Sequence, residues 1–295
     1  MKIRPEARPD DITQMQQTKP QRFFNDSFAR DVLYIAAAAA YADNPQPCLT
    51  NRLRGAYVIG KYKADCGPLP FQGFDYCYGF TAVSEFHRAV ILSFRGAQNL
   101  AQFLMEDFQA VFEKKSPLFG GGKVARYFHD GFNSVWTKGM YRDLLFLRKR
   151  HPNYEIWITG HSLGGSMSAI AAHELVVNPL FAGCRIVTVT FSEPRTGDAE
   201  FVEAHNRLLN YTYRVVHKND FMPHWPSNLI GYRQYKYEIF YDNDMKRGDG
   251  YRFCKESEDS SCSAKTILNL SPFDHFHYYK HNTIEFGRRG CKIRR

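Results

Sequence analysis

A serine in the segment Gly160 to Gly165, which reads GHSLGG, is the residue of this chain best suited to covalent chemistry. Residues 156–158 read as a buried strand, and apolar residues recur at helical spacing over 167–175. The glycines around Ser162 remove side chains where a sharp turn would crowd the strand against the helix. Such a turn exposes the hydroxyl near a helix N-terminus, where free N–H groups favour developing negative charge. We therefore expect Ser162 to be a nucleophile.

A serine hydroxyl becomes reactive when a histidine takes its proton and a carboxylate fixes the tautomer of that histidine. Asp220 follows a predicted strand, at the end of an open α/β sheet where catalytic groups gather, although Asn219-Asp220 is equally compatible with an ordinary turn. Of the eleven histidines, His275 comes late enough to give the chain order serine, aspartate, histidine. His277 and His281 remain alternatives for the base.

The elements that must position these residues alternate between strand and helix. Strands rich in Val, Ile and aromatic residues are predicted at 89–94, 155–159, 185–191 and 211–216. Met140, Leu144 and Leu147 share one face of a helix that should end near Pro152. Alternating aromatic and charged residues over 232–253 predict an antiparallel hairpin at an edge. This alternation favours an α/β fold with a mostly parallel sheet covered by helices on both faces.

Length and charge limit the organisation and the partners. The 295 residues, 44% of them hydrophobic, supply a sizeable core. We expect a flexible, proline-containing lead-in over residues 1–21 and a single domain over 22–295. The 39 Lys and Arg against 30 Asp and Glu give a net charge of +9. These basic residues are scattered and accompany no recognition helix, so we expect no nucleic-acid partner.

Cysteines favour an extracellular setting. Six of the seven cysteines lie in loop-like or terminal segments where cross-links are plausible, whereas Cys184 opens an apolar run and should be a buried free thiol. Sequons at Asn25, Asn210 and Asn269 are compatible with secretion. The longest apolar run, 32–42, is too short to span a membrane and reads as a packed helix. No secretory signal is visible, so we expect that a signal peptide is missing from this version of the chain.

Five phrases give the chain a specific resemblance. They are Ser93 to Gly96, Phe128 to Phe132, Thr159 to Gly165, Glu193 to Gly197, and Arg214 to Asp220 followed by Met222 to Pro226. Over about residues 28–291 the chain resembles the class 3, fungal-type triacylglycerol lipases. The resemblance implies an α/β-hydrolase fold, hydrolysis of lipid esters at an oil–water or membrane interface, and a triad of Ser162, Asp220 and His275.

The same resemblance implies further features. The pairs Cys48–Cys291, Cys66–Cys77 and Cys254–Cys262 would form disulfides. The N–H groups of Leu163 and Ala97 would form the oxyanion hole. The related lipases commonly have a serine or threonine in place of Ala97, so one hydroxyl donor is missing here. Ser192 likewise replaces a glycine that is usual in the family.

A helix after Ala97 presents an apolar stripe at helical spacing, formed by Leu100, Phe103, Leu104 and Phe108. A core-facing helix explains such a stripe, but the resemblance places a mobile lid here that turns toward lipid at an interface. If it is a lid, activity should rise sharply once an ester exceeds its solubility.

Other functions remain open. The same triad would serve a phospholipase A1 or a cinnamoyl-type esterase, and the pocket shape that decides between them is not visible in the sequence. A catalytically weak secreted relative that binds lipid or protein is the alternative from another class. The intact order of Ser, Asp and His argues against it, whereas Ala97 favours it slightly. The acidic pairs at 106–107 and 242–244 lack the spacing of a ligand set, so we expect neither a metal nor an organic cofactor.

Overall fold

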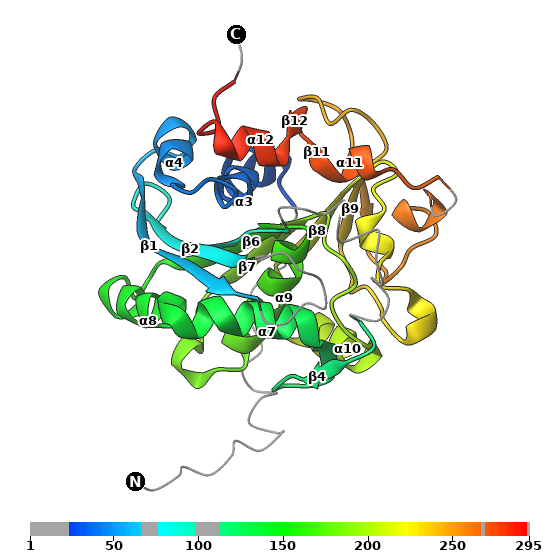
Figure 1. Ribbon diagram of the computed structural model, residues 1–295, viewed down its shortest axis with the longest axis horizontal. Coiled ribbons are helices and arrows are strands. Elements are labelled where there is room, and N and C mark those ends of the chain that lie inside the picture. Colours follow the sequence, from blue (N-terminus) through cyan, green and yellow to red (C-terminus); the bar gives the residue numbers. More distant parts are fainter. Residues whose placement is uncertain (1–23, 67–75, 98–111, 267–268, 294–295) are drawn as a thin grey trace, which may run out of the picture.

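The computed structural model describes residues 24–66, 76–97, 112–266 and 269–293. Its centre is an eight-stranded sheet in the order β1-β2-β3-β6-β7-β8-β9-β10 (Figure 1). These strands are β1 Ala56–Asp65, β2 Tyr76–Ser84, β3 Ala89–Phe94, β6 Glu155–His161, β7 Ile186–Phe191, β8 Thr212–His217, β9 Glu238–Tyr241 and β10 Arg252–Cys254. The pairings from β3 to β9 are parallel, and the remaining pairings at both edges are antiparallel. The sheet is therefore mostly parallel, as the sequence predicted.

The four predicted strands correspond to β3, β6, β7 and β8. The bounds of β3 are as predicted, and those of the other three differ by one or two residues. The predicted edge hairpin exists as β9 and β10, but it is shorter than 232–253, and β9 also pairs parallel to β8. The strands β1 and β2 were not predicted. Among the ten residues of β1 only Ala56 and Ala64 are buried, so this edge strand lacks the continuous apolar run by which the buried strands were recognised.

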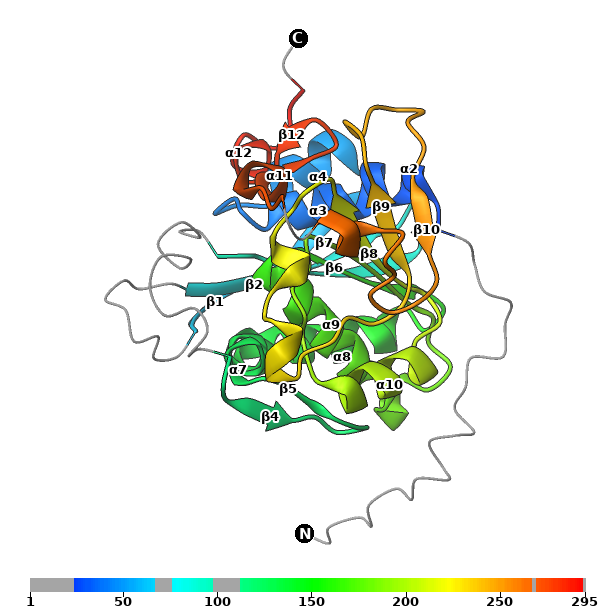
Figure 2. The same cartoon turned by 90° about the vertical axis from the view of Figure 1, so that its right-hand side faces the viewer.

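Helices cover both faces of the sheet (Figures 1 and 2). One face carries α2 Asp26–Phe28, η1 Ala29–Leu33, α3 Tyr34–Ala39, α4 Gln46–Arg52 and α12 Thr283–Arg288. The other carries α7 Arg126–Val135, η2 Trp136–Met140, α8 Tyr141–Arg150, α9 Leu163–Val176 and α10 Ala199–Leu208. Shorter elements are β4 Lys115–Pro117, β5 Lys123–Ala125, η3 Pro179–Phe181, η4 Met222–His224, η5 Asn228–Ile230, η6 Ser263–Thr266, α11 Pro272–Phe276, β11 His277–Tyr278 and β12 His281–Asn282.

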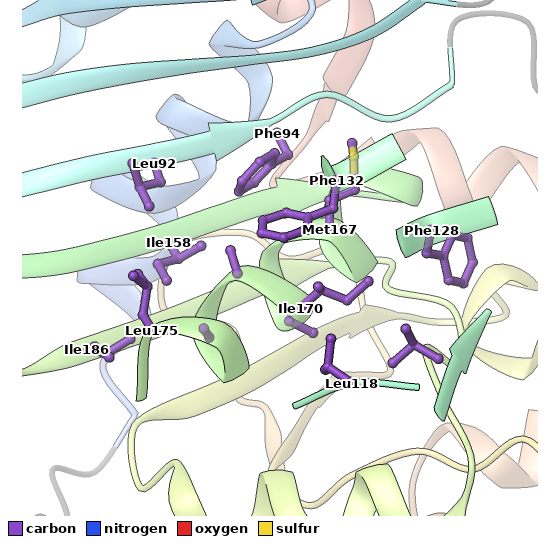
Figure 3. Close-up of a cluster of buried hydrophobic side chains, with 14 of the residues drawn as sticks. Leu92, Phe94, Leu118, Phe128, Phe132, Ile158, Met167, Ile170, Leu175 and Ile186 are labelled. Carbon is purple, nitrogen blue, oxygen red and sulfur yellow. The ribbon is translucent and has the colours of Figure 1, made fainter. Parts of the chain in front are cut away.

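Two hydrophobic cores follow from the alternation of side chains along the buried strands. In β3, Leu92 and Phe94 enter one core while Ile91 enters the other. Figure 3 shows the first core, in which Leu92 lies near Ile158 of β6 and Phe94 lies near Met167 of α9. The second core contains all of α3, whose six residues are buried. This burial agrees with the packed helix predicted for 32–42.

Three disulfides join Cys48 to Cys291, Cys66 to Cys77 and Cys254 to Cys262, which are the pairs that the resemblance implied. Cys184 is free and buried, as predicted. None of the helices in the described ranges is both long enough and apolar enough to cross a membrane. The predicted flexible segment 1–21 lies outside the described residues.

Candidate active site

Ser162 lies on a sharp turn between β6 and α9. Its backbone has φ 59° and ψ −130°, a conformation that residues other than glycine rarely adopt. A side chain at Gly160 would overlap the carbonyl of Gly164, and one at Gly164 would overlap the carbonyl of Phe94. The glycines of the GHSLGG segment therefore permit the close approach of strand and helix that presents Ser162 at the start of α9.

The two predicted oxyanion donors lie beside this serine. Leu163 is the first residue of α9, where an N–H group has no acceptor within the helix. A Cβ built on Gly96 would lie 3.0 Å from the Cβ of Ser162, so the main chain leading into Ala97 adjoins the turn. Ala97 itself is buried against Phe221 and Met222. This arrangement can supply two N–H groups to an oxygen bound next to Ser162.

The structure brings Asp220 and His275 together from positions 55 residues apart. Asp220 follows β8, His275 belongs to α11, and their side chains meet with Nδ1 of His275 3.3 Å from Oδ1 of Asp220. Both are fully buried. The alternative bases lie elsewhere, since Nδ1 of His277 donates to the carbonyl of Phe273 and His281 stacks on the ring of Phe286.

The Asp220 carboxylate is held by further donors. Tyr278 donates its hydroxyl to Oδ2 at 2.7 Å, and the N–H of Met222 donates to Oδ1 at 3.0 Å. Burial raises the pKa of Asp220, but the charge of His275 and hydrogen bonds from His275, Ser192 and Tyr278 outweigh it, so the pKa lies below its usual value. Asp220 is therefore ionised at neutral pH. Asp220 closes a turn with His217, as Asn219-Asp220 in the sequence allowed, and its side chain also contacts His275.

His161 connects the nucleophile turn to His275. Its ring lies 4.8 Å from that of His275, and its Nε2 is 2.8 Å from the carbonyl oxygen of His275. Because a carbonyl only accepts, Nε2 carries the hydrogen, and Nδ1 accepts from the hydroxyl of Tyr41 at 2.7 Å. Burial and the charge of His275 lower the pKa of His161 to about 3, so this ring is neutral. His161 thus forms hydrogen bonds behind the nucleophile turn.

Nε2 of His275 is buried and has no hydrogen-bond partner within the described ranges, and no hydrogen bond joins it to Ser162 there. An unpaired nitrogen of this kind is available to accept a proton. His161, the residue before Ser162, links the nucleophile turn to His275. It contacts both the ring and the main chain of His275.

Ser192 and Tyr278 also contact the pair of His275 and Asp220, although the sequence predicted a role for neither. The Oγ of Ser192 lies 2.5 Å from Nδ1 of His275, which is closer than Asp220. The only signal for Ser192 was that a serine stands where related lipases have glycine. Nothing in the local sequence distinguished Tyr278 from the other tyrosines.

The remaining predictions concern residues outside this cluster. Leu100, Phe103, Leu104 and Phe108, predicted as a lid, lie outside the described residues. Arg195 bonds to Glu258 and to the carbonyl groups of His224 and Pro226, and so holds these loops together. Within the described ranges, the one cluster of potential metal ligands is Glu238 with Cys254 and Cys262, and the disulfide between these cysteines occupies both sulfurs.

Comparisons with known proteins agree with this geometry. A family model described as lipase (class 3) matches residues 91–229. Lipase ZK262.3 of Caenorhabditis elegans is 29% identical over 91% of this chain and 83% of its own length. Secreted mono- and diacylglycerol lipase 2 of Gibberella zeae is 30% identical, over 52% of this chain and 43% of its own length. The matches to such fungal relatives span about half of those proteins, at 49%, 55% and 43% of their lengths.

Among solved structures, the triacylglyceride lipase of Rhizomucor miehei superposes with a TM-score of 0.74 at 20% identity, covering 90% of this chain and 98% of that one. This similarity shows that the two share the α/β-hydrolase fold. The family model covers the nucleophile turn and the nematode relative extends over most of the chain, so the chain is similar to class 3 lipases in the region that carries the site.

Proposed function

We propose that this protein hydrolyses carboxylic esters of lipids through an acyl-enzyme formed on Ser162. The observation that supports this most directly is the strained turn at Ser162, joined through His161 to the buried pair of His275 and Asp220. A serine at the start of a helix, a histidine with an unpaired nitrogen and an ionised carboxylate are the three groups that acyl transfer requires.

In the first step, the Oγ of Ser162 attacks the ester carbonyl carbon while Nε2 of His275 takes the hydroxyl proton. Asp220 stays ionised and stabilises the imidazolium that forms. The N–H groups of Leu163 and Ala97 donate to the oxyanion. His275 then gives its proton to the leaving alcohol. Water repeats the sequence on the acyl-enzyme and releases the fatty acid, which restores Ser162.

The substrate class is tested by comparing esters. The experiment measures hydrolysis of p-nitrophenyl esters, of emulsified triglyceride and of phospholipid vesicles side by side, each over a range of acyl lengths. Preference for emulsified triglyceride supports the lipase, whereas preference for phospholipid or for short soluble esters identifies a phospholipase or another esterase on this fold. Ser162→Ala is the control that must abolish every activity due to this site.

A fluorophosphonate probe separates an enzyme from a lipid-binding relative without knowledge of the substrate. Labelling confined to Ser162, and lost in Ser162→Ala, supports a serine hydrolase. A folded protein that stays unlabelled would contradict the proposal and favour the catalytically weak binder.

The protein acts outside the cytosol in this proposal. Three disulfides favour an oxidising compartment, and the Gibberella relative is named a secreted lipase. Among the sequons, Asn25 and Asn269 are exposed, whereas Asn210 is partly buried. Expression through the secretory route of animal cells should therefore add glycans at Asn25 or Asn269 that peptide N-glycosidase removes. Secreted protein that receives no glycan and forms none of the three disulfides would contradict this location.

A further inference from the structure

Ser192 occupies an unusual position beside the proposed base. It follows directly after β7, is fully buried, and its N–H donates to the carbonyl of Val215 at 3.0 Å. Its φ of 55° lies in the left-handed region, where glycine is favoured. A serine is therefore kept at a backbone position that disfavours any side chain, and such strain is commonly retained where the side chain has a function.

The hydroxyl of Ser192 is a closer neighbour of the His275 ring than the carboxylate is. Its Oγ lies 2.5 Å from Nδ1 of His275, against 3.3 Å for Oδ1 of Asp220. The hydrogen bonds that Asp220 accepts also include one from Ser192. Ser192 thus contacts both the histidine and the carboxylate.

Hydrogen-bond chemistry assigns the protons in this group. The ionised Asp220 only accepts, so Nδ1 of His275 carries a hydrogen, which Asp220 and the Ser192 oxygen both accept. The Ser192 hydroxyl hydrogen then points at Asp220, and Ser192 also contacts Tyr278, which itself donates to Asp220. Further titratable groups of the described ranges lie around this cluster. Tyr278 donates to Asp220, and His161 is neutral and donates to the main chain of His275. The charge of Asp220 also acts on His217 and His224.

We propose that Ser192 is a positioning residue of the reaction, whose hydroxyl accepts the Nδ1 hydrogen of His275 and donates its own hydrogen to Asp220. It links acid and base across the 3.3 Å between them and fixes the tautomer in which Nε2 is free to take a proton. The inference rests on the proposed function, because it concerns how His275 acts on Ser162.

The test compares Ser192→Ala with Ser192→Gly. Both remove the hydroxyl, but only glycine relaxes the backbone at this φ. Loss of a hydrogen bond to a charged group should lower kcat and the rate of fluorophosphonate labelling of Ser162 about 10-fold in both variants, with KM changed less than about twofold. The acidic limb of the pH–rate profile should also move. The proton NMR signal of the His275 Nδ1 hydrogen should shift in both variants.

Ser84→Ala is the matched control. Ser84 is also a buried serine whose Oγ contacts a histidine Nδ1, that of His87, at 2.8 Å. It lies at the end of β2, beside the beginning of β3 and β6, whereas Ser162 follows the other end of β6. Its removal should leave kcat, the labelling rate and the pH profile unchanged.

Three outcomes would overturn the proposal: an unchanged rate and pH profile in both variants, a loss in Ser192→Ala that Ser192→Gly does not share, or a slower rate with an unmoved Nδ1 signal. Circular dichroism checks folding, and Ser192→Gly is the variant that the backbone accommodates without strain. If the folded wild type itself is not labelled, the proposed function fails, whereas the NMR signal still tests whether Ser192 contacts His275.

Discussion

His161 donates its Nε2 hydrogen to the carbonyl oxygen of His275 at 2.8 Å. The residue before the nucleophile therefore holds the main chain of the proposed base, although the two are 114 positions apart. The lowered pKa of His161 follows from burial and from the charge of His275, so the ring acts as a fixed donor rather than as a second base.

His161→Phe keeps an aromatic ring but removes the two hydrogen bonds of the imidazole, one with the Tyr41 hydroxyl and one with the His275 carbonyl. We expect the free energy of unfolding to fall by about 1–3 kcal/mol, measured by urea denaturation. Fluorophosphonate labelling of Ser162 should slow because His275 is held less well. His129→Phe is the control, since His129 bonds within α7 to Asn133. Equal effects of the two substitutions on labelling would contradict the link to His275.

Glu193 makes stability depend on pH in a definite direction. Burial raises its pKa from 4.5 to about 7, despite hydrogen bonds from Thr190 and Tyr235 that act the other way. Between these two pH values the folded protein keeps a proton that the unfolded chain releases. The stabilisation by this group is therefore complete below pH 4.5 and is lost as the pH rises toward 7.

The glutamine in Glu193→Gln cannot ionise. The free energy of unfolding of the wild type should therefore fall, relative to that of the variant, as the pH rises from 4.5 to 7. Urea denaturation of both proteins at several pH values measures this difference. The histidines titrate equally in both proteins and cancel. A difference that stays constant over the range would show that Glu193 is ionised when folded.

Ala97 offers a test of the oxyanion loop by gain of activity. Related lipases commonly carry a hydroxyl at this position, and the main chain here adjoins Ser162. Ala97→Thr supplies such a donor, while Ala97→Val has nearly the same shape without it. Removal of one oxyanion donor from an enzyme typically costs 100-fold or more in kcat. We expect kcat for Thr to exceed that for Val by about 10-fold or more.

Both Ala97 variants must fit against Phe221 and Met222, so each can lose some stability through overpacking. The comparison between them removes this effect. Equal kcat values for Thr and Val on p-nitrophenyl butyrate would show that a side chain at position 97 does not reach the oxyanion.

Local sequence predicted the elements that depend on local patterns. The parallel strands β3, β6, β7 and β8 are continuous apolar runs because both faces are buried, and α9 follows from apolar spacing after Ser162. The edge strand β1 was not predicted because one face of it meets solvent, which interrupts the apolar run. Spacing left three histidines open as the base, and only the resemblance favoured His275.

The contacts of Ser192 and Tyr278 could not be predicted in this way. Ser192 meets His275 across 83 positions and Tyr278 meets Asp220 across 58, and such contacts arise from the packing of β7, β8 and β11 rather than from any periodicity. A departure from the family pattern at position 192 was visible, but its meaning required the geometry of His275.

The disulfide between Cys48 and Cys291 secures the end of the chain that carries His275. It joins α4 to the residues just after α12 and closes a loop of 243 positions. Replacing both cysteines by alanine should lower the free energy of unfolding by about 5 kcal/mol, since a cross-link over so long a loop restricts the unfolded chain strongly. Thermal unfolding without reductant measures the loss. Cys184→Ala replaces a buried free thiol and should lower the free energy of unfolding far less. A comparable loss in Cys184→Ala would mean that packing, and not the cross-link, accounts for the effect.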